Sequence, residues 1–222
     1  MKNKQSITEL IRQRVLVLDG AMGTMIQQYN LEEKDFRGEI LADHPHELQG
    51  NNDILSLTRP DIIEKIHLDY LEAGADLIET NTFNATSISQ ADYHTEAYVY
   101  DINREAARIA RRAAEEYTRR TPDRPRYVVG SMGPTNKTAS MSPDVNDPGY
   151  RAVTFEELRD AYREQAEGLL EGGAEVFMVE TIFDTLNAKA ALMALEEMME
   201  HHGVNLPVMV SGTITDASGR TL

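Results

Sequence analysis

Acidic and small polar residues follow short apolar runs at five places in this chain. The runs end at Asp19-Gly20, Glu79-Thr80-Asn81-Thr82, Gly130-Ser131, Glu180-Thr181 and Ser211-Gly212-Thr213. A carboxylate that directly follows a buried strand is costly to desolvate unless a positive group meets it. For Glu79 and Glu180 that group is either a substrate ammonium or, as a structural alternative, an arginine or a cluster of backbone N–H groups.

The first polar cluster continues as a glycine-containing turn, Asp19-Gly20-Ala21-Met22-Gly23-Thr24, which opens a helix through Gln27. Glycines let backbone N–H groups approach a small anion closely, and the start of a helix favours negative charge. The turn is neither G-x-G-x-x-G nor a P-loop with its lysine, so a substrate carboxylate suits it better than a nucleotide phosphate. A tight strand-to-helix turn with Asp19 as the helix cap is the alternative.

Alternating strands and helices must position these side chains. Strands are expected at about 15–19, 76–80, 126–131, 175–180 and 207–212, and helices at about 62–74, 98–117, 154–172 and 186–202. The third helix has the capping box Thr154-Phe155-Glu156-Glu157 at its start. Strands separated by helices are parallel, so their polar ends should gather on one rim, where α/β folds place their chemistry.

A repeated unit favours a barrel over a doubly wound sheet. Glu72-Ala73-Gly74-Ala75 and Glu171-Gly172-Gly173-Ala174 both stop a helix with glycine, and a strand with an acidic tip follows each of them. Five strands can be counted and a closed (β/α)8 barrel needs eight. We therefore expect residues 1–222 to form a single domain, the N-terminal part of a C-terminally truncated (β/α)8 TIM-type barrel with about five βα units.

Two segments are long for connections. Residues 131–153 are rich in proline, asparagine and aspartate, which argues for a fixed path and for covering a substrate or docking a domain. Residues 36–58 are similarly rich in turn formers and contain Gly50-Asn51-Asn52-Asp53, so this segment could fold over the same rim.

Composition excludes several classes of function. A net charge of −15 disfavours nucleic acid and anionic membranes as partners, because both are bound through lysine and arginine. No apolar stretch approaches the length of a membrane helix and no signal-peptide core follows Met1, so the expected location is the cytoplasm. The chain has no cysteine, which excludes disulfides and a thiolate-ligated metal from this segment, and its six histidines show no convincing ligand spacing.

Six phrases along the chain carry a resemblance to one family. They are Val17-Leu18-Asp19-Gly20-Ala21-Met22-Gly23-Thr24, Gly50-Asn51-Asn52-Asp53, Glu79-Thr80-Asn81-Thr82-Phe83, Gly133-Pro134-Thr135-Asn136-Lys137-Thr138 with Ser142-Pro143-Asp144-Val145-Asn146-Asp147-Pro148, Glu180-Thr181-Ile182-Phe183-Asp184-Thr185-Leu186-Asn187-Ala188-Lys189, and Ser211-Gly212-Thr213-Ile214-Thr215-Asp216. The sequence closely resembles the N-terminal homocysteine-binding domain of cobalamin-dependent methionine synthase, within the homocysteine S-methyltransferase family.

The resemblance implies a (β/α)8 barrel with homocysteine at its C-terminal rim. It also implies a zinc ion, held by three cysteines from later strands, that binds the homocysteine sulfur as a thiolate. The thiolate takes a methyl group from methylcobalamin, and methyltetrahydrofolate restores the corrinoid on separate folate, cobalamin and activation domains of the same chain. The zinc cysteines of the family lie beyond Leu222, so this segment alone is expected to bind neither zinc nor methylcobalamin and to be inactive.

Carried over by position, the resemblance implies that Asp19 and Glu180 hold the substrate ammonium. The backbone of Gly20, Ala21, Met22 and Gly23 would receive the substrate carboxylate, and the remaining pocket residues would be Glu79, Asn81 and Thr213. Two alternatives remain. One is a homocysteine S-methyltransferase that uses betaine or a sulfonium donor, and the other is a non-catalytic barrel fragment that binds or docks.

Overall fold

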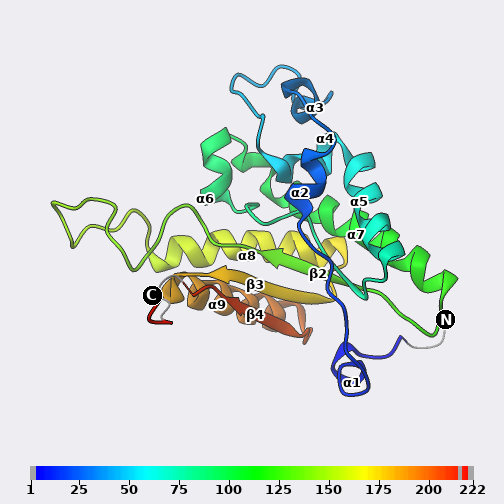
Figure 1. Cartoon of the computed structure of the whole chain (residues 1–222). Coiled ribbons are helices and arrows are strands. Elements are labelled where there is room, and N and C mark those ends of the chain that lie inside the picture. Colours follow the sequence, from blue (N-terminus) through cyan, green and yellow to red (C-terminus); the bar gives the residue numbers. More distant parts are fainter. Residues whose placement is uncertain (1–3, 215–216, 220–222) are drawn as a thin grey trace.

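Four parallel strands, neighbours in chain order, form the sheet. They are β1 (Leu77–Glu79), β2 (Tyr127–Met132), β3 (Val176–Ile182) and β4 (Val208–Gly212), in the order β1-β2-β3-β4. The structure is a computed structural model that describes residues 4–214 and 217–219. Their parallel registers bring the carboxyl ends of all four strands to one rim (Figure 1).

One long helix precedes each strand and packs beside the helix of the next unit. These helices are α5 (Pro60–Ala73), α7 (Val99–Arg120), α8 (Phe155–Gly172) and α9 (Thr185–His202). α5 contacts α7, α7 contacts α8 and α8 contacts α9, so the helices follow the order of the strands. This is the arrangement of consecutive units in a (β/α) barrel, and the expected fold class is confirmed as a partial TIM-type barrel.

The helix ends follow local rules that the sequence displays. Thr154 and Glu157 form the expected capping box at the start of α8. Gly74 and Gly173 end α5 and α8 in the left-handed region, with φ of 109° and 103°. Residues other than glycine adopt this conformation at a cost. The repeated glycine stop is thus the same physical device in both units.

Close packing of α7 against α8 depends on two further glycines. A Cβ atom at Gly168 or Gly172 would fall inside van der Waals contact with the α7 backbone, at Tyr100 and Arg104 respectively. The helices approach each other there because α8 presents no side chain at these two positions.

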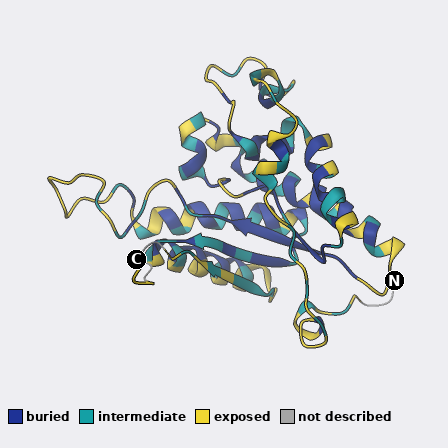
Figure 2. Ribbon diagram, in the orientation of Figure 1, coloured by how far each residue is buried: buried dark blue, intermediate teal, exposed yellow. Residues whose placement is uncertain are grey.

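Short helices occupy the connections. They are α1 (Ile7–Leu10), α2 (Met22–Gln27), α3 (Glu33–Arg37), η1 (Asn52–Ile54), α4 (Leu55–Thr58), α6 (Ser87–Gln90), η2 (Ala91–Tyr93) and η3 (Glu96–Tyr98). In Figure 1, α2, α3, α4 and α6 lie together on one side of the sheet, and α1 lies apart from them. Residues 133–153 contain no helix or strand. The middle of this segment projects from the body as an exposed loop (Figure 2), whereas Thr135, Ala139 and Val153 near its ends are buried.

Both faces of the sheet are buried at β1 and β2. The face toward the helices includes Ile78 and Val128, which pack with alanines of α7. The opposite face carries Leu77, Tyr127 and Val129, which pack with Leu10 of α1 and Val176 of β3. Near-continuous apolar strands are typical of parallel sheets covered on both sides.

The prediction of a full strand at 15–19 is wrong. Among the described residues this segment forms one isolated bridge, Leu18 with Leu77, although the backbone N–H of Asp19 also donates to the carbonyl of Leu77. Val15 and Val17 are 85% and 51% exposed, whereas Leu16 and Leu18 are partly buried against the core, so only one side of this apolar run is covered. β4 is also less covered than the inner strands, with Val210 58% exposed.

A buried carboxylate ties the segment before Asp19 to the amino end of β1. Asp76 is fully buried and accepts two hydrogen bonds from Arg14, at 2.8 Å each, and one each from Arg124 and the backbone N–H of Val17. Burial alone would raise the pKa of Asp76, but these donors lower it to about 2.

No helix in the described ranges combines the length and apolar character that crossing a membrane requires.

Candidate functional site

A pocket of about 420 Å³ opens at the carboxyl ends of the strands. It is lined by residues from five separate segments: Gly20, Ala21, Met22, Gly23, Asn52, Asp53, Glu79, Thr80, Asn81, Thr82, Phe83, Asn84, Ser131 and Glu180. This is the position that the polar strand ends predict. A pocket of this size has room for an amino acid.

The glycine turn forms one wall of the pocket. α2 begins at Met22, and its N-cap residue Ala21 offers no side-chain acceptor to the backbone N–H groups of the first turn. Asp19 does not cap this helix, because its two carboxylate oxygens accept the backbone N–H of Glu79 at 3.1 Å. The alternative in which Asp19 is only a helix cap is therefore wrong. Asp19 instead joins the turn to the tip of β1.

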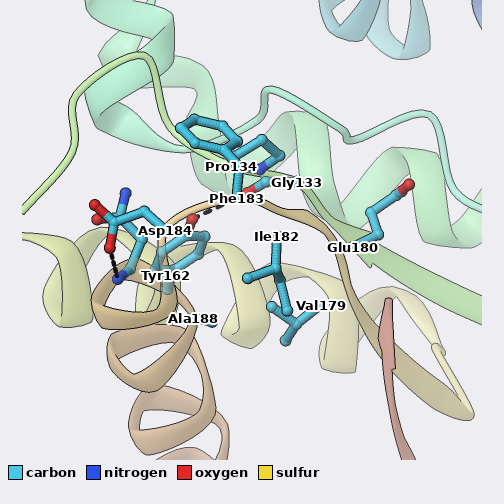
Figure 3. Close-up of a pocket in the computed structure, with 10 residues that line it drawn as sticks. Gly133, Pro134, Tyr162, Val179, Glu180, Ile182, Phe183, Asp184 and Ala188 are labelled. Atoms are coloured by element: carbon cyan, nitrogen blue, oxygen red, sulfur yellow. Dashed lines mark hydrogen bonds between the residues drawn. The ribbon is translucent and has the colours of Figure 1, made fainter. Parts of the chain in front are cut away.

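Three carboxyl groups converge here from neighbouring elements. Asp19 follows the segment that is bridged to β1. Glu79 is the last residue of β1, and Glu180 lies near the end of β3. The Ser131 hydroxyl, at the end of β2, donates to Oε1 of Glu180. Figure 3 shows Glu180 on β3 with its side chain directed away from Tyr162 and Asp184. Thus Glu180 belongs to the large pocket more than to the cavity of about 10 Å³ beside Tyr162, which has room for about one water molecule.

The pKa values of Asp19 and Glu79 are strongly raised. Burial raises the pKa of Asp19 to about 8 against the opposing hydrogen bond from Glu79, and repulsion from Glu79 and Glu180 adds to the rise. Burial, with repulsion from Glu180, raises the pKa of Glu79 to about 7. Oε1 of Glu79 is buried and has no hydrogen-bond partner. A cluster of buried acids without a counter-charge favours the entry of a cation.

Asn52 and Asp53 form a second wall of the pocket, which the sequence motifs predicted only in outline. The Asn81 amide donates to the carbonyl of Asn52 at 2.7 Å. Asp53 is 4% exposed, accepts the backbone N–H of Asn84 at 2.9 Å, and has a pKa raised by burial to about 6. The Gly50-Asn51-Asn52-Asp53 phrase signalled a functional segment, but no spacing rule indicated which strand tip it would meet.

The structure brings together most, but not all, of the residues expected at the site. Glu79, Asn81 and Glu180 line the pocket with the glycine turn, whereas Asp19 does not line it and meets it through the backbone N–H of Glu79. Thr213 does not line it, and its backbone N–H donates to the carbonyl of Ile182 at 2.7 Å. The substrate-binding role of all these residues stays a prediction. Thr215 and Asp216, the end of the last resembling phrase, lie outside the described residues.

The long loop is anchored beside the pocket rather than inside it. Ser140 donates through its backbone and its hydroxyl to Asp184, and the Ala139 N–H donates to Asn187, both at the start of α9. None of residues 133–153 lines the 420 Å³ pocket. The base of the loop therefore has a fixed path, as its turn residues predict, and its covering or docking role stays a prediction.

The residues of this chain do not fit a zinc site. The chain has no cysteine, and within residues 4–214 and 217–219 no three His, Asp or Glu side chains are grouped so that they could hold a metal ion.

Comparison with known proteins identifies the family. The model of the homocysteine S-methyltransferase family matches residues 16–222, and the chain belongs to this family. Among solved structures it is similar to the homocysteine methyltransferase MmuM from Escherichia coli. The metallated form gives a TM-score of 0.66 at 23% identity, and the match covers 94% of this chain and 66% of that one.

The oxidized form of the same Escherichia coli protein gives a TM-score of 0.69 at 22% identity, and the match covers 98% of this chain and 70% of that one. At this identity the likeness establishes the fold alone. The present chain spans about two thirds of the length of the structures that it matches.

Proposed function

We propose that this chain is the homocysteine-binding part of a methyltransferase that makes methionine, and that the 420 Å³ pocket receives the substrate. The observation that carries the proposal is the convergence of Asp19, Glu79 and Glu180 beside a glycine turn in a chain of this family. A free amino acid carries an ammonium and a carboxylate close together. Acidic groups next to free backbone N–H groups are complementary to this zwitterion.

In this proposal the ammonium and the carboxylate of the zwitterion bind to different walls of the pocket. The carboxylates of Asp19 and Glu180 accept hydrogen bonds from the substrate ammonium, and the backbone from Gly20 to Gly23 donates to the substrate carboxylate. Glu79 and Asn81 line the space between, and Thr213 is a less direct contributor. Ser131 is a positioning residue, because its hydroxyl donates to Glu180 and fixes that carboxylate.

For the methyl donor we propose methylcobalamin, carried by another domain of a longer protein. Folate and activation domains of that protein would serve the corrinoid, and the zinc ion would be held by cysteines that this chain does not contain. The resemblance of the phrases from Gly133 to Pro148 supports this choice over betaine or a sulfonium donor. Methyl transfer to homocysteine without any corrinoid would favour the alternative.

The test is Glu180→Gln in a protein where this chain is followed by the family's cysteine-bearing strands. Loss of one charge-assisted contact costs about 1.5–3 kcal/mol, so the Kd for homocysteine should rise about 10-fold to 100-fold in isothermal titration. Zinc content should stay unchanged. The matched control is Glu156→Gln, an exposed glutamate in the first turn of α8.

Equal affinity in wild type and Glu180→Gln would contradict the assigned role of Glu180. Loss of zinc together with unfolding would also contradict it, since the residue would then be structural. A wild-type protein that binds no homocysteine would overturn the proposed function itself.

A further inference from the structure

Within residues 4–214 and 217–219, the carboxyl cluster has no positively charged partner. None of the residues that line the pocket is a lysine, arginine or histidine. Among the described residues no ion pair involves Asp19, Glu79 or Glu180. The donors that reach the cluster are neutral: the Glu79 N–H to Asp19, and the hydroxyls of Ser131 and Thr181 to Glu180.

We propose that, without a ligand, the pocket holds a proton shared between Asp19 and Glu79 beside the carboxylate of Glu180, and that the entry of a cationic amino group releases this proton to solvent. The inference rests on the proposed function, because it assumes that the ligand amino group reaches this cluster. It adds a property that the proposed function does not require, since a fully ionised pocket could also bind an ammonium.

Electrostatics gives the reason. Two like charges in one poorly solvated site do not both ionise readily, so acids of this kind share protons. Glu79 has a buried oxygen without a partner, which is the environment that disfavours a carboxylate most. The raised pKa values of Asp19 and Glu79, about 8 and about 7, agree with a cluster that is partly protonated at neutral pH.

The groups that face the cluster from other elements do not supply the missing charge. Asp53, from η1, is a further acid in the same pocket, and burial raises its pKa to about 6. Tyr70, from α5, donates to the carbonyl of Ala21, and burial with the nearby Asp19 raises its pKa above the usual value. Tyr70 is therefore neutral at pH 7, and Asp53 adds negative charge.

The proton balance is simple. A carboxyl O–H bond of the cluster breaks and its proton goes to the buffer, while the substrate ammonium keeps its three protons and donates them as hydrogen bonds to the new carboxylate. Binding should therefore tighten with rising pH, by up to about tenfold per unit between about pH 6 and pH 8. A pocket already ionised in that range would show no such slope.

The experiment measures proton release with a ligand that has no thiol of its own. L-methionine retains the ammonium and the carboxylate but carries no dissociating S–H group. Isothermal titration at pH 7, in phosphate and in Tris, separates the buffer's ionisation heat from the binding heat. We expect roughly half a proton to one proton released for each bound L-methionine.

A matched ligand and a matched variant sharpen the test. The des-amino analogue of methionine, 4-(methylthio)butanoic acid, lacks the ammonium and should release no proton. Glu79→Gln should reduce the release seen with L-methionine, and the wild-type buffer comparison stands by itself if that variant does not fold. Binding of L-methionine with no proton released overturns the inference and leaves the proposed function intact. If neither homocysteine nor L-methionine binds, both are overturned.

Discussion

Ionisation of the buried acids in the pocket should reduce the free energy of unfolding, and Glu79 offers the clearest measure of this loss. Its pKa is raised from 4.5 to about 7 in the folded chain. The folded state then binds more protons than the unfolded state between these values, so stability is lost as pH rises through this window. Glu79→Gln has no carboxyl proton to lose and should escape this loss.

The expected magnitude follows from the size of the shift. A displacement of 2.5 units corresponds to at most about 3.4 kcal/mol at high pH, since one pKa unit is about 1.4 kcal/mol. Linkage gives a contribution of about 1 kcal/mol at pH 5 and about 3 kcal/mol at pH 8. The stability of Glu79→Gln relative to wild type should therefore improve by about 2 kcal/mol from pH 5 to pH 8.

Urea unfolding followed by circular dichroism at pH 5, 6, 7 and 8 measures this difference. Any constant offset caused by the exchange of side chains cancels when the two ends of the series are compared. Glu156→Gln is the control on α8, and its difference from wild type should not grow with pH. A gap between Glu79→Gln and wild type that is the same at pH 5 and pH 8 would refute the claim that Glu79 is difficult to ionise in the folded chain.

Two further predictions concern the frame that holds the pocket. Asp76→Asn should destabilise the protein by about 2 kcal/mol at pH 7 and by only about 1 kcal/mol at pH 3. The pKa of Asp76 is lowered, so its contribution is present above the unfolded value near pH 4 and is lost as pH falls toward 2. Urea unfolding at both pH values tests this, and equal costs would show that the contacts with Arg14 act independently of charge. Gly172→Ala should cost about 1–3 kcal/mol by overpacking α8 against Arg104 of α7. Gly212→Ala, which meets nothing within 4 Å, should change the thermal unfolding midpoint little, and similar losses in both variants would contradict the packing argument.

The sequence predicted the long helices and inner strands well because local and global signals agree there. At the start of α8, the Thr154 capping box, the apolar stripe behind it and the Gly173 stop all indicate one helix, and the structure contains that helix. β3 reads as a buried apolar run and is one. Such agreement between propensity, capping and burial is what makes an element readable from sequence.

The first expected strand shows why an apolar run is insufficient. Val15 and Val17 have strand-forming side chains, but strand pairing depends on neighbours that are distant in sequence. This segment forms one isolated bridge to β1, and among the described residues its backbone hydrogen bonds there are made by Val17 and Asp19 alone. The short α3 and α4 helices were not predicted either. A single helical turn carries too few residues for a periodic pattern to emerge.

For the site, the sequence predicted the polar residues at the strand ends, but it did not predict which of them Asn52 and Asp53 would contact. Glu79, Asn81 and Glu180 could be predicted because each ends a recognisable apolar run. Asn52 and Asp53 meet Asn81 and Asn84 through hydrogen bonds made between separate segments, which no pattern within either segment determines. The raised pKa values also could not be predicted, because they depend on burial and on which carboxyls share a space.

The pocket has a consequence for the way binding competence is acquired during synthesis. Its acidic groups are far apart along the chain, and the last of them, Glu180, enters the site only after β3 has docked beside β2. If these acids hold the ligand as proposed, no early portion of the polypeptide contains the whole site. A molecule that bridges Asp19 and Glu180 would link the segment before β1 to β3, and its binding free energy would add to the cooperative stability of the assembled sheet.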